Sequence, residues 1–130
     1  MNLHDRIVGM LPENVNADAH LVWRGRHLNT TFMLRVGEQE YVIAIREGRI
    51  ASVTPGPSVM PEWTFSLLAD ESSWQEFWQA VPRPGFHDLF AMLKFRRLRM
   101  EGTLHPFMSN ILYFKQALAS IRLTKEEAAQ

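Results

Sequence analysis

The chain has 130 residues, of which 46% are hydrophobic and 22% charged, and it contains no cysteine. This composition predicts one folded domain over residues 1–130, and it excludes disulfides, thiolate metal sites and cysteine catalysis. The 14 basic and 14 acidic side chains cancel, which argues against a general nucleic-acid binder. The chain starts without an apolar signal core, and no apolar run approaches the roughly 20 residues needed to span a bilayer, so we expect a cytoplasmic protein.

The first 28 residues have helical periodicity with unclear boundaries. Leu3, Ile7 and Leu11 share one helical face, and Pro12 is expected to end that short helix. Asn16 is a candidate cap for a second helical segment over residues 17–23. An extended lead-in to a sheet fits the same residues, and the pattern leaves both alternatives open.

The middle of the chain shows the two-residue alternation of β-strands. Four such segments are expected, at residues 31–36, 40–46, 49–53 and 63–68. Glu47-Gly48 is typical of a two-residue hairpin turn, which would place Arg46 opposite Arg49. Because like charges are unfavourable when they face each other, the Arg46 face is predicted to be solvated.

After the fourth strand the apolar period becomes that of a helix. Asp70, Ser72 or Ser73 can cap a first helix, and a second is expected over residues 86–93. The two helices together carry five large aromatic side chains: Trp74, Phe77, Trp78, Phe86 and Phe90.

The last part of the chain predicts a strand followed by a helix. Residues 96–101 alternate, and Glu101-Gly102 then breaks the strand. Thr103 is a candidate N-cap for a terminal helix over about 104–120, with Pro106 in the first turn. Four apolar residues mark the buried stripe of that helix: Phe107, Met108, Ile111 and Leu112.

This order of elements predicts an α+β fold, a five-stranded and mainly antiparallel sheet with helices packed on one face. Four stretches, taken in order, resemble the sterol carrier protein (nonspecific lipid-transfer) domain family: Tyr41-Val-Ile-Ala-Ile-Arg-Glu-Gly-Arg-Ile, Trp63-Thr-Phe-Ser-Leu, the Trp74 helix, and Leu98-Arg-Met-Glu-Gly-Thr-Leu. The resemblance covers about residues 28–120 and is to a bacterial-type stand-alone member. It implies an apolar tunnel between sheet and helices for sterols, fatty acyl chains or similar lipids. The chain ends Glu126-Glu-Ala-Ala-Gln instead of in the peroxisomal tripeptide, so neither peroxisomal import nor a specifically sterol ligand is expected.

The predicted ligand-binding residues are the large apolar side chains of the three helices after the fourth strand. They are Trp74, Phe77, Trp78, Phe86, Phe90, Phe107, Met108, Ile111 and Leu112. Pure core packing is the alternative for each of them, but nine such side chains on one modest sheet favour a cavity. The expected partner is a hydrophobic small molecule, with transient enzyme or membrane contact and no nucleic acid. The sequence does not define the oligomeric state.

The titratable residues form no catalytic or metal-binding motif. The histidines lack the i, i+4 ligand spacing of helical zinc sites, and nucleophile elbows and phosphate- or dinucleotide-binding loops are absent. We expect no metal, no cofactor and no enzyme activity. One alternative is an enzyme that acts on a steroid- or polyketide-like substrate in the same pocket, with His87, Asp88 or His105 as general acid or base. Another is a noncatalytic interaction subunit with a filled core.

A basic run precedes and enters the last strand. It consists of Lys94, Arg96, Arg97 and Arg99. We expect a solvated sheet edge that discourages aggregation, and the alternative is contact with anionic headgroups or a membrane surface.

Overall fold

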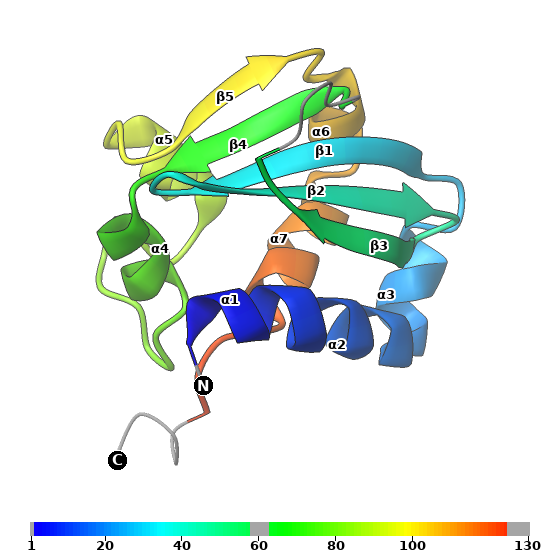
Figure 1. Cartoon of the computed structure of the whole chain (residues 1–130), viewed down its shortest axis with the longest axis horizontal. Coiled ribbons are helices and arrows are strands. Elements are labelled where there is room, and N and C mark those ends of the chain that lie inside the picture. The colour runs from blue at the N-terminus through cyan, green and yellow to red at the C-terminus, as the bar shows by residue number, and fades with distance from the viewer. Residues whose placement is uncertain (1, 58–62, 125–130) are drawn as a thin grey trace.

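The computed structural model describes residues 2–57 and 63–124 and shows a sheet with helices gathered on one face (Figure 1). The five strands are β1 Asn29–Val36, β2 Gln39–Arg46, β3 Arg49–Pro55, β4 Phe65–Ala69 and β5 Arg99–Gly102. Their spatial order is β3-β2-β1-β4-β5. β1 and β4 run parallel and the other neighbouring pairs are antiparallel, so the predicted fold class is confirmed.

The hairpin between β2 and β3 forms as its sequence predicts. Glu47 and Gly48 both have positive φ angles, 51° and 79°, which is the conformation that matches the twist of two paired strands. Arg46 lies opposite Arg49, and both side chains are exposed. The charged face of this hairpin is therefore solvated.

Eight helical segments lie among the described residues. They are α1 Leu3–Asp5, the π-helical turn η1 Arg6–Met10, α2 Leu11–Ala17, α3 Ala19–Arg24, α4 Glu71–Phe77, α5 Leu89–Lys94, α6 His105–Ser109 and α7 Ile111–Ala119. Asp70 caps α4 by accepting a hydrogen bond from the Ser73 N–H, as predicted. The helical alternative holds for the segment before β1, although Asp18 rather than Asn16 caps α3. No helix of the described residues has the length and apolar character needed to cross a membrane.

The predicted helix end at Pro12 is wrong, because the helical path continues through α2. Pro12 lies in the first turn of α2, directly after the π-helical turn. The Leu11 N–H still donates to the Arg6 carbonyl in the π pattern. A change from π to α bonding creates a new helix start, where the missing N–H of proline removes no hydrogen bond.

Three further boundaries differ from the prediction in the second half of the chain. The helix predicted over 86–93 begins at Leu89, where Asp88 is its N-cap, and β5 begins at Arg99 instead of residue 96. The predicted terminal helix is divided at Asn110, and Thr103 is not its cap. The Asn110 side chain donates to the Pro106 carbonyl, a local bond that competes with helical geometry.

The space between the sheet and the helices is filled by aromatic rings. Phe65 of β4 stacks on Phe32 of β1 with ring centroids 5.3 Å apart, and Phe114 of α7 meets both rings edge-on. Phe107 of α6 joins the same cluster, 5.7 Å from Phe65. These contacts fix α6 and α7 against the middle of the sheet.

Candidate ligand-binding site

Four of the nine predicted ligand-binding residues belong to the buried core. Trp74, Phe77, Trp78 and Phe107 are exposed by 0 to 2%. The Trp74 indole N–H donates to the Arg35 carbonyl at 2.9 Å, and the Trp78 indole N–H donates to the Leu118 carbonyl at 2.7 Å. Both indoles therefore connect α4 to other elements, and contact with a ligand remains a prediction for these four residues.

Four others lie at the outside of the helix layer. Phe90, Met108 and Leu112 are exposed by 38%, 45% and 55%, and Ile111 is partly buried. The Lys115 ammonium lies 4.6 Å from the centre of the Phe90 ring, and Ile111 precedes Lys115 by about one helical turn. We use the name apolar strip for these four positions on α5, α6 and α7: Phe90, Met108, Ile111 and Leu112.

The ninth residue, Phe86, lies in the loop before α5 and is partly buried. The guanidinium groups of Arg83 and Arg97 lie 5.2 and 5.7 Å from the centre of its ring. Phe86 thus lies beside two cationic groups. It is not on the apolar side of a helix as predicted, because α5 begins three residues later, at Leu89.

A cavity of about 360 Å³ lies between α4, α5 and α7. Phe77, Leu89 and Ala119 line its apolar part, and His87, Asp88, Lys115, Gln116 and Arg122 line its polar part. The Asp88 carboxylate accepts hydrogen bonds from the Phe90 N–H and the Lys115 ammonium, both at 3.1 Å. Asp88 therefore has a capping and pairing role in α5.

Arg122, three residues after the end of α7, lines the same cavity. Its guanidinium donates to the Phe77 carbonyl at 2.9 Å and to the His87 carbonyl at 2.7 Å. Burial lowers the pKa of the Arg122 guanidinium, and the charge of Asp88 opposes that shift. Neither Lys115 nor Arg122 is recognisable as a site residue from sequence, because their partners lie 27 to 45 positions away.

His105, the remaining candidate acid or base, is exposed at the start of α6. Its imidazole contacts the Ser109 hydroxyl at 3.2 Å, one helical turn later. Among residues 2–57 and 63–124, no three histidine, aspartate or glutamate side chains are grouped as they would be in a metal site. His105 and Ser109 form a local surface contact.

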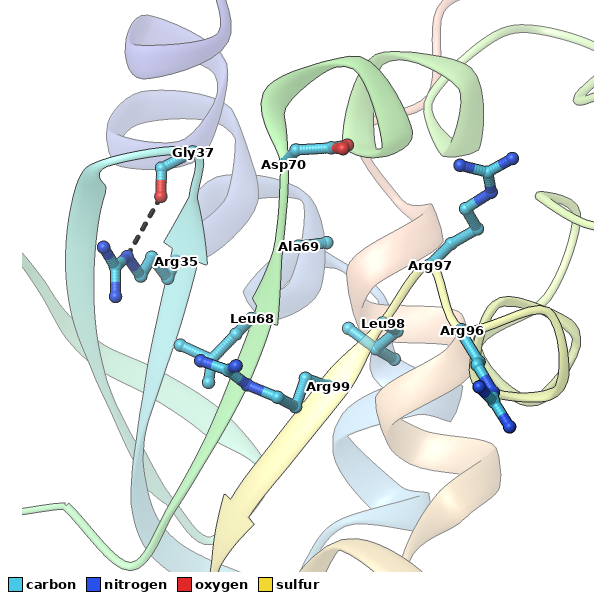
Figure 2. Close-up of a pocket in the computed structure, with 9 residues that line it drawn as sticks. All are labelled: Arg35, Gly37, Leu68, Ala69, Asp70, Arg96, Arg97, Leu98 and Arg99. Carbon is cyan, nitrogen blue, oxygen red and sulfur yellow. Dashed lines mark hydrogen bonds between the residues drawn. The ribbon is translucent and has the colours of Figure 1, made fainter.

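A second cavity of about 400 Å³ lies at the edge where β1, β4 and β5 approach α4 (Figure 2). It is lined by Arg35, Gly37, Leu68, Ala69, Asp70, Arg96, Arg97, Leu98 and Arg99, and we call it the arginine pocket. The sequence predicts a basic edge from Arg96, Arg97 and Arg99. It gives no sign of Arg35, which strand pairing brings to the same place.

No family model matches the chain, and no curated protein matches it significantly. Solved structures do. Sterol carrier protein 2 matches with a TM-score of 0.70 and 14% identity, over 88% of this chain and 92% of that chain. A ubiquinone synthesis protein, UbiJ-SCP2, matches with a TM-score of 0.58 and 15% identity, over 90% of this chain and 92% of that one. The sec-alkylsulfatase Pisa1 from Pseudomonas sp. matches with a TM-score of 0.60 and 13% identity, over 88% of this chain and 16% of that longer chain. The chain therefore has the fold of sterol carrier protein domains.

Proposed function

We propose that this protein binds a hydrophobic small molecule of the lipid, fatty acyl, sterol or isoprenoid class and holds it for transfer or for presentation to an enzyme. The observation that carries the proposal is the apolar strip, which exposes Phe90, Met108 and Leu112 on helices that cover an aromatic interior. The shared fold supports the proposal, since the similar structures include sterol carrier protein 2 and a ubiquinone synthesis protein.

A bound acyl or isoprenoid chain would extend from the apolar strip toward Phe107. Phe107 lies in the five-residue helix α6, which joins α7 through the non-helical backbone of Asn110. Movement of α6 about Asn110 would separate Phe107 from Phe65 and Phe114, and these rings would become the wall of the tunnel. The residues of α6 and α7 would then contact the ligand, and contact of the other predicted residues, Trp74, Phe77, Trp78, Phe86 and Phe90, remains a prediction.

The energetics of such binding are moderate. Burial of roughly 300 Å² of apolar surface at about 25 cal/mol per Å² gives a gross gain of about 7 kcal/mol. The cost of ordering the ligand reduces this gain, so we expect affinities of roughly micromolar order.

Native mass spectrometry of the purified protein, followed by lipid extraction, tests the proposal directly. We expect a copurified hydrophobic molecule, and a fatty acid or quinone titration should change the tryptophan fluorescence with saturation. Leu112→Gln should weaken binding by about tenfold, because it places an amide in the apolar strip. Val81→Gln is the matched control, since Val81 is 76% exposed in the loop after α4. If no fatty acid, sterol or quinone binds with saturation, the interaction-subunit alternative replaces this proposal.

The carrier and the enzyme make different predictions for the polar residues. A carrier holds its ligand by apolar burial, so His87→Ala and His105→Ala should each leave lipid affinity within about tenfold. An enzyme that used one of them as a general acid or base would lose about a hundred- to ten-thousandfold in rate. Turnover of a hydrophobic substrate by the wild type, abolished in one folded variant, would establish the enzyme.

A further inference from the structure

Three phenylalanine rings on and beside α5 each lie next to at least one basic side chain. The Lys115 ammonium is 4.6 Å from the centre of the Phe90 ring, and the Lys94 ammonium is 5.8 Å from the centre of the Phe95 ring. The Phe86 ring has two guanidinium groups beside it, as described above. We use the name basic aromatic face for these three rings together with the four cations over them.

The ring and cation pairs form one continuous surface. Phe90 and Lys94 are one turn apart on α5, which places their side chains on the same side of the helix. The Phe95 ring lies against Gly85, since a Cβ atom on Gly85 would be 3.3 Å from Phe95 Cδ2. Because Gly85 directly precedes Phe86, the loop after α4 and the end of α5 meet at these two rings.

The backbone at the end of α5 turns the chain back toward that loop. Arg96 has a φ of 59°, at a position after a helix where glycine is the common residue. The Arg97 N–H donates to the Met92 carbonyl at 2.7 Å, which closes the helix end. After this turn the Arg97 guanidinium lies over the Phe86 ring.

The basic aromatic face is exposed although much of it is apolar. Phe90 and Phe95 are exposed by 38% and 58%, and the side chains of Lys94 and Arg97 are exposed as well. Phe90 also belongs to the apolar strip, so the two surfaces are continuous at this residue. Exposed apolar groups that are bordered by charges mark an interaction surface.

This part of the chain is strongly basic within a neutral protein. Residues 81–99 carry five basic side chains and a single acidic one, so the rest of the chain carries nine basic and thirteen acidic side chains. Two of the cations over the rings pair with carboxylates at 3.1 Å. Within residues 2–57 and 63–124, no carboxylate lies at ion-pair distance from Lys94, Arg96 or Arg97. Their positive charge is therefore available to an anionic partner.

We propose that the basic aromatic face docks the protein on the surface of a membrane that contains anionic lipids. Lys94 and Arg97 lie among the headgroups, and Phe90 and Phe95 enter the apolar boundary beneath them. A bilayer fits better than a nucleic acid, because a cation already lies over each ring and competes with the stacking of a base. Docking rests on the proposed lipid function for its purpose, whereas the surface itself requires no bound ligand.

The opposite end of the molecule supplies matched controls. In Figure 1, α5 lies at the left of the view, while α3 and the β2–β3 turn lie at the right. Trp23 of α3 is exposed by 58%, the same fraction as Phe95, and the Arg26 guanidinium is 4.0 Å from the centre of its ring. Arg46 is an exposed cation at the end of β2.

The test measures co-sedimentation of the full chain with phosphatidylcholine vesicles, with and without phosphatidylglycerol, at physiological ionic strength, where distant charges are largely screened. Binding should be at least about tenfold stronger with phosphatidylglycerol. Lys94→Gln should weaken it about fivefold, since each basic residue near an anionic surface contributes about 1 kcal/mol. Phe95→Ala should weaken it about tenfold through lost apolar burial. Trp23→Ala and Arg46→Gln should each change it by less than about twofold.

A fluorescent label reports which end of the molecule meets the bilayer. Because the chain contains no cysteine, Phe95→Cys and Trp23→Cys each provide a single site for a bimane group. Anionic vesicles should shield the label of Phe95→Cys from quenching by aqueous iodide, and should leave the label of Trp23→Cys accessible. The reverse pattern would overturn the proposal.

Two variants separate docking from ligand binding. Lys94→Gln should leave a fatty acid titration without vesicles unchanged, and Leu112→Gln should leave vesicle docking within about twofold. Docking without any saturable ligand would retain this proposal and remove the carrier. Lys94 is exposed, so its variant decides the matter if circular dichroism shows that Phe95→Ala fails to fold. Equal binding to both kinds of vesicle, equal losses for Phe95→Ala and Trp23→Ala, or a preference for a single-stranded oligonucleotide over the vesicles would overturn the proposal.

Discussion

Gly48 lies where the β2–β3 turn meets α3 and α7. A Cβ atom on Gly48 would lie 2.5 Å from the Val22 carbonyl oxygen and 2.8 Å from the Gly25 carbonyl carbon, both of them backbone atoms. The residue also has a φ of 79°, which disfavours any side chain. We therefore expect Gly48→Ala to lower the free energy of unfolding by roughly 2 kcal/mol or more, measured by urea denaturation.

Gly9 provides the control for that substitution. An added Cβ there meets no atom within 4 Å, and Gly9 lies in the helical turn η1. Gly9→Ala should leave stability unchanged or raise it by up to about 1 kcal/mol through helix propensity. Equal losses in the two variants would contradict the steric account of the Gly48 contact.

Two buried hydroxyl groups should respond differently to removal. The Tyr113 hydroxyl donates to the Gly48 carbonyl at 2.7 Å, and burial raises its pKa. The Ser66 hydroxyl is fully buried on β4 and has no hydrogen-bond partner among the described residues. Tyr113→Phe should cost about 1 kcal/mol, whereas Ser66→Ala should be neutral or stabilising, because no hydrogen bond is lost. Thermal unfolding of the two variants measures the contrast, and a clear loss for Ser66→Ala would reveal a partner.

At the level of elements, Asp70 gives α4 a stability that depends on pH. Hydrogen bonds from Ser73, helped by the charge of Arg97, hold the pKa of the Asp70 carboxyl below its usual value. A carboxyl whose pKa is lowered in the folded state stabilises the fold above its unfolded pKa, and the effect is lost as the pH falls through the folded value. Asp70→Asn should therefore match the wild type more closely at acidic pH than at neutral pH.

The cap itself can be separated from the charge. Asp70→Ala removes the acceptor for the Ser73 N–H and should cost about 1 kcal/mol at neutral pH, while Asp70→Asn keeps an acceptor and should cost less. Asp18→Ala, which removes the corresponding cap of α3, is a comparison at a helix remote from the arginine pocket. A pH profile of Asp70→Asn that parallels the wild type would show that the carboxylate is not responsible.

Sequence predicts the elements whose signals are local. The hairpin at Glu47 and Gly48 and the cap at Asp70 need only neighbouring residues, and both form as predicted. The break at Asn110 and the continuation through Pro12 depend on which competing hydrogen bonds the backbone adopts. The spacing of apolar residues does not depend on that choice. It therefore predicts one terminal helix where α6 and α7 are separate, and a helix end at Pro12 where the helical path continues.

At the level of the whole molecule, sequence could not separate buried from exposed members of one apolar stripe. Phe107 and Met108 are neighbours on α6, yet they are exposed by 0% and 45%. The aromatic cluster around Phe65 determines which of them turns inward. The sequence likewise could not predict the arginine pocket, because only the parallel pairing of β1 with β4 brings Arg35 to it.

Side chains near the start of the described chain donate hydrogen bonds to the carbonyl groups that directly follow α7. Asn14 of α2 donates to the Ser120 carbonyl at 2.8 Å, and the buried Arg6 guanidinium donates through Nε to the Ile121 carbonyl at 3.1 Å. Carbonyl groups at a helix end have no partner within the helix, so these side chains act as a C-terminal cap from 106 and 115 positions away.

Removal of this long-range cap should weaken α7 and the whole fold together. We expect Arg6→Ala to lower the free energy of unfolding by about 2 to 3 kcal/mol, because loss of the charged donor leaves the Ile121 carbonyl unpaired. Asn14→Ala should lower it by about 1 kcal/mol.

Hydrogen exchange distinguishes two outcomes of the Arg6→Ala substitution. If the cap holds only the helix end, amides near Leu118 exchange faster while those of β1 and β2 do not. If α7 docks as part of one cooperative unit, both regions lose protection by the same free energy. We expect the second outcome, since Phe114 of α7 packs directly on Phe32 and Phe65 of the sheet and cannot leave without exposing both rings. Unchanged protection of the strands in a destabilised Arg6→Ala variant would show that the helix layer opens independently of the sheet.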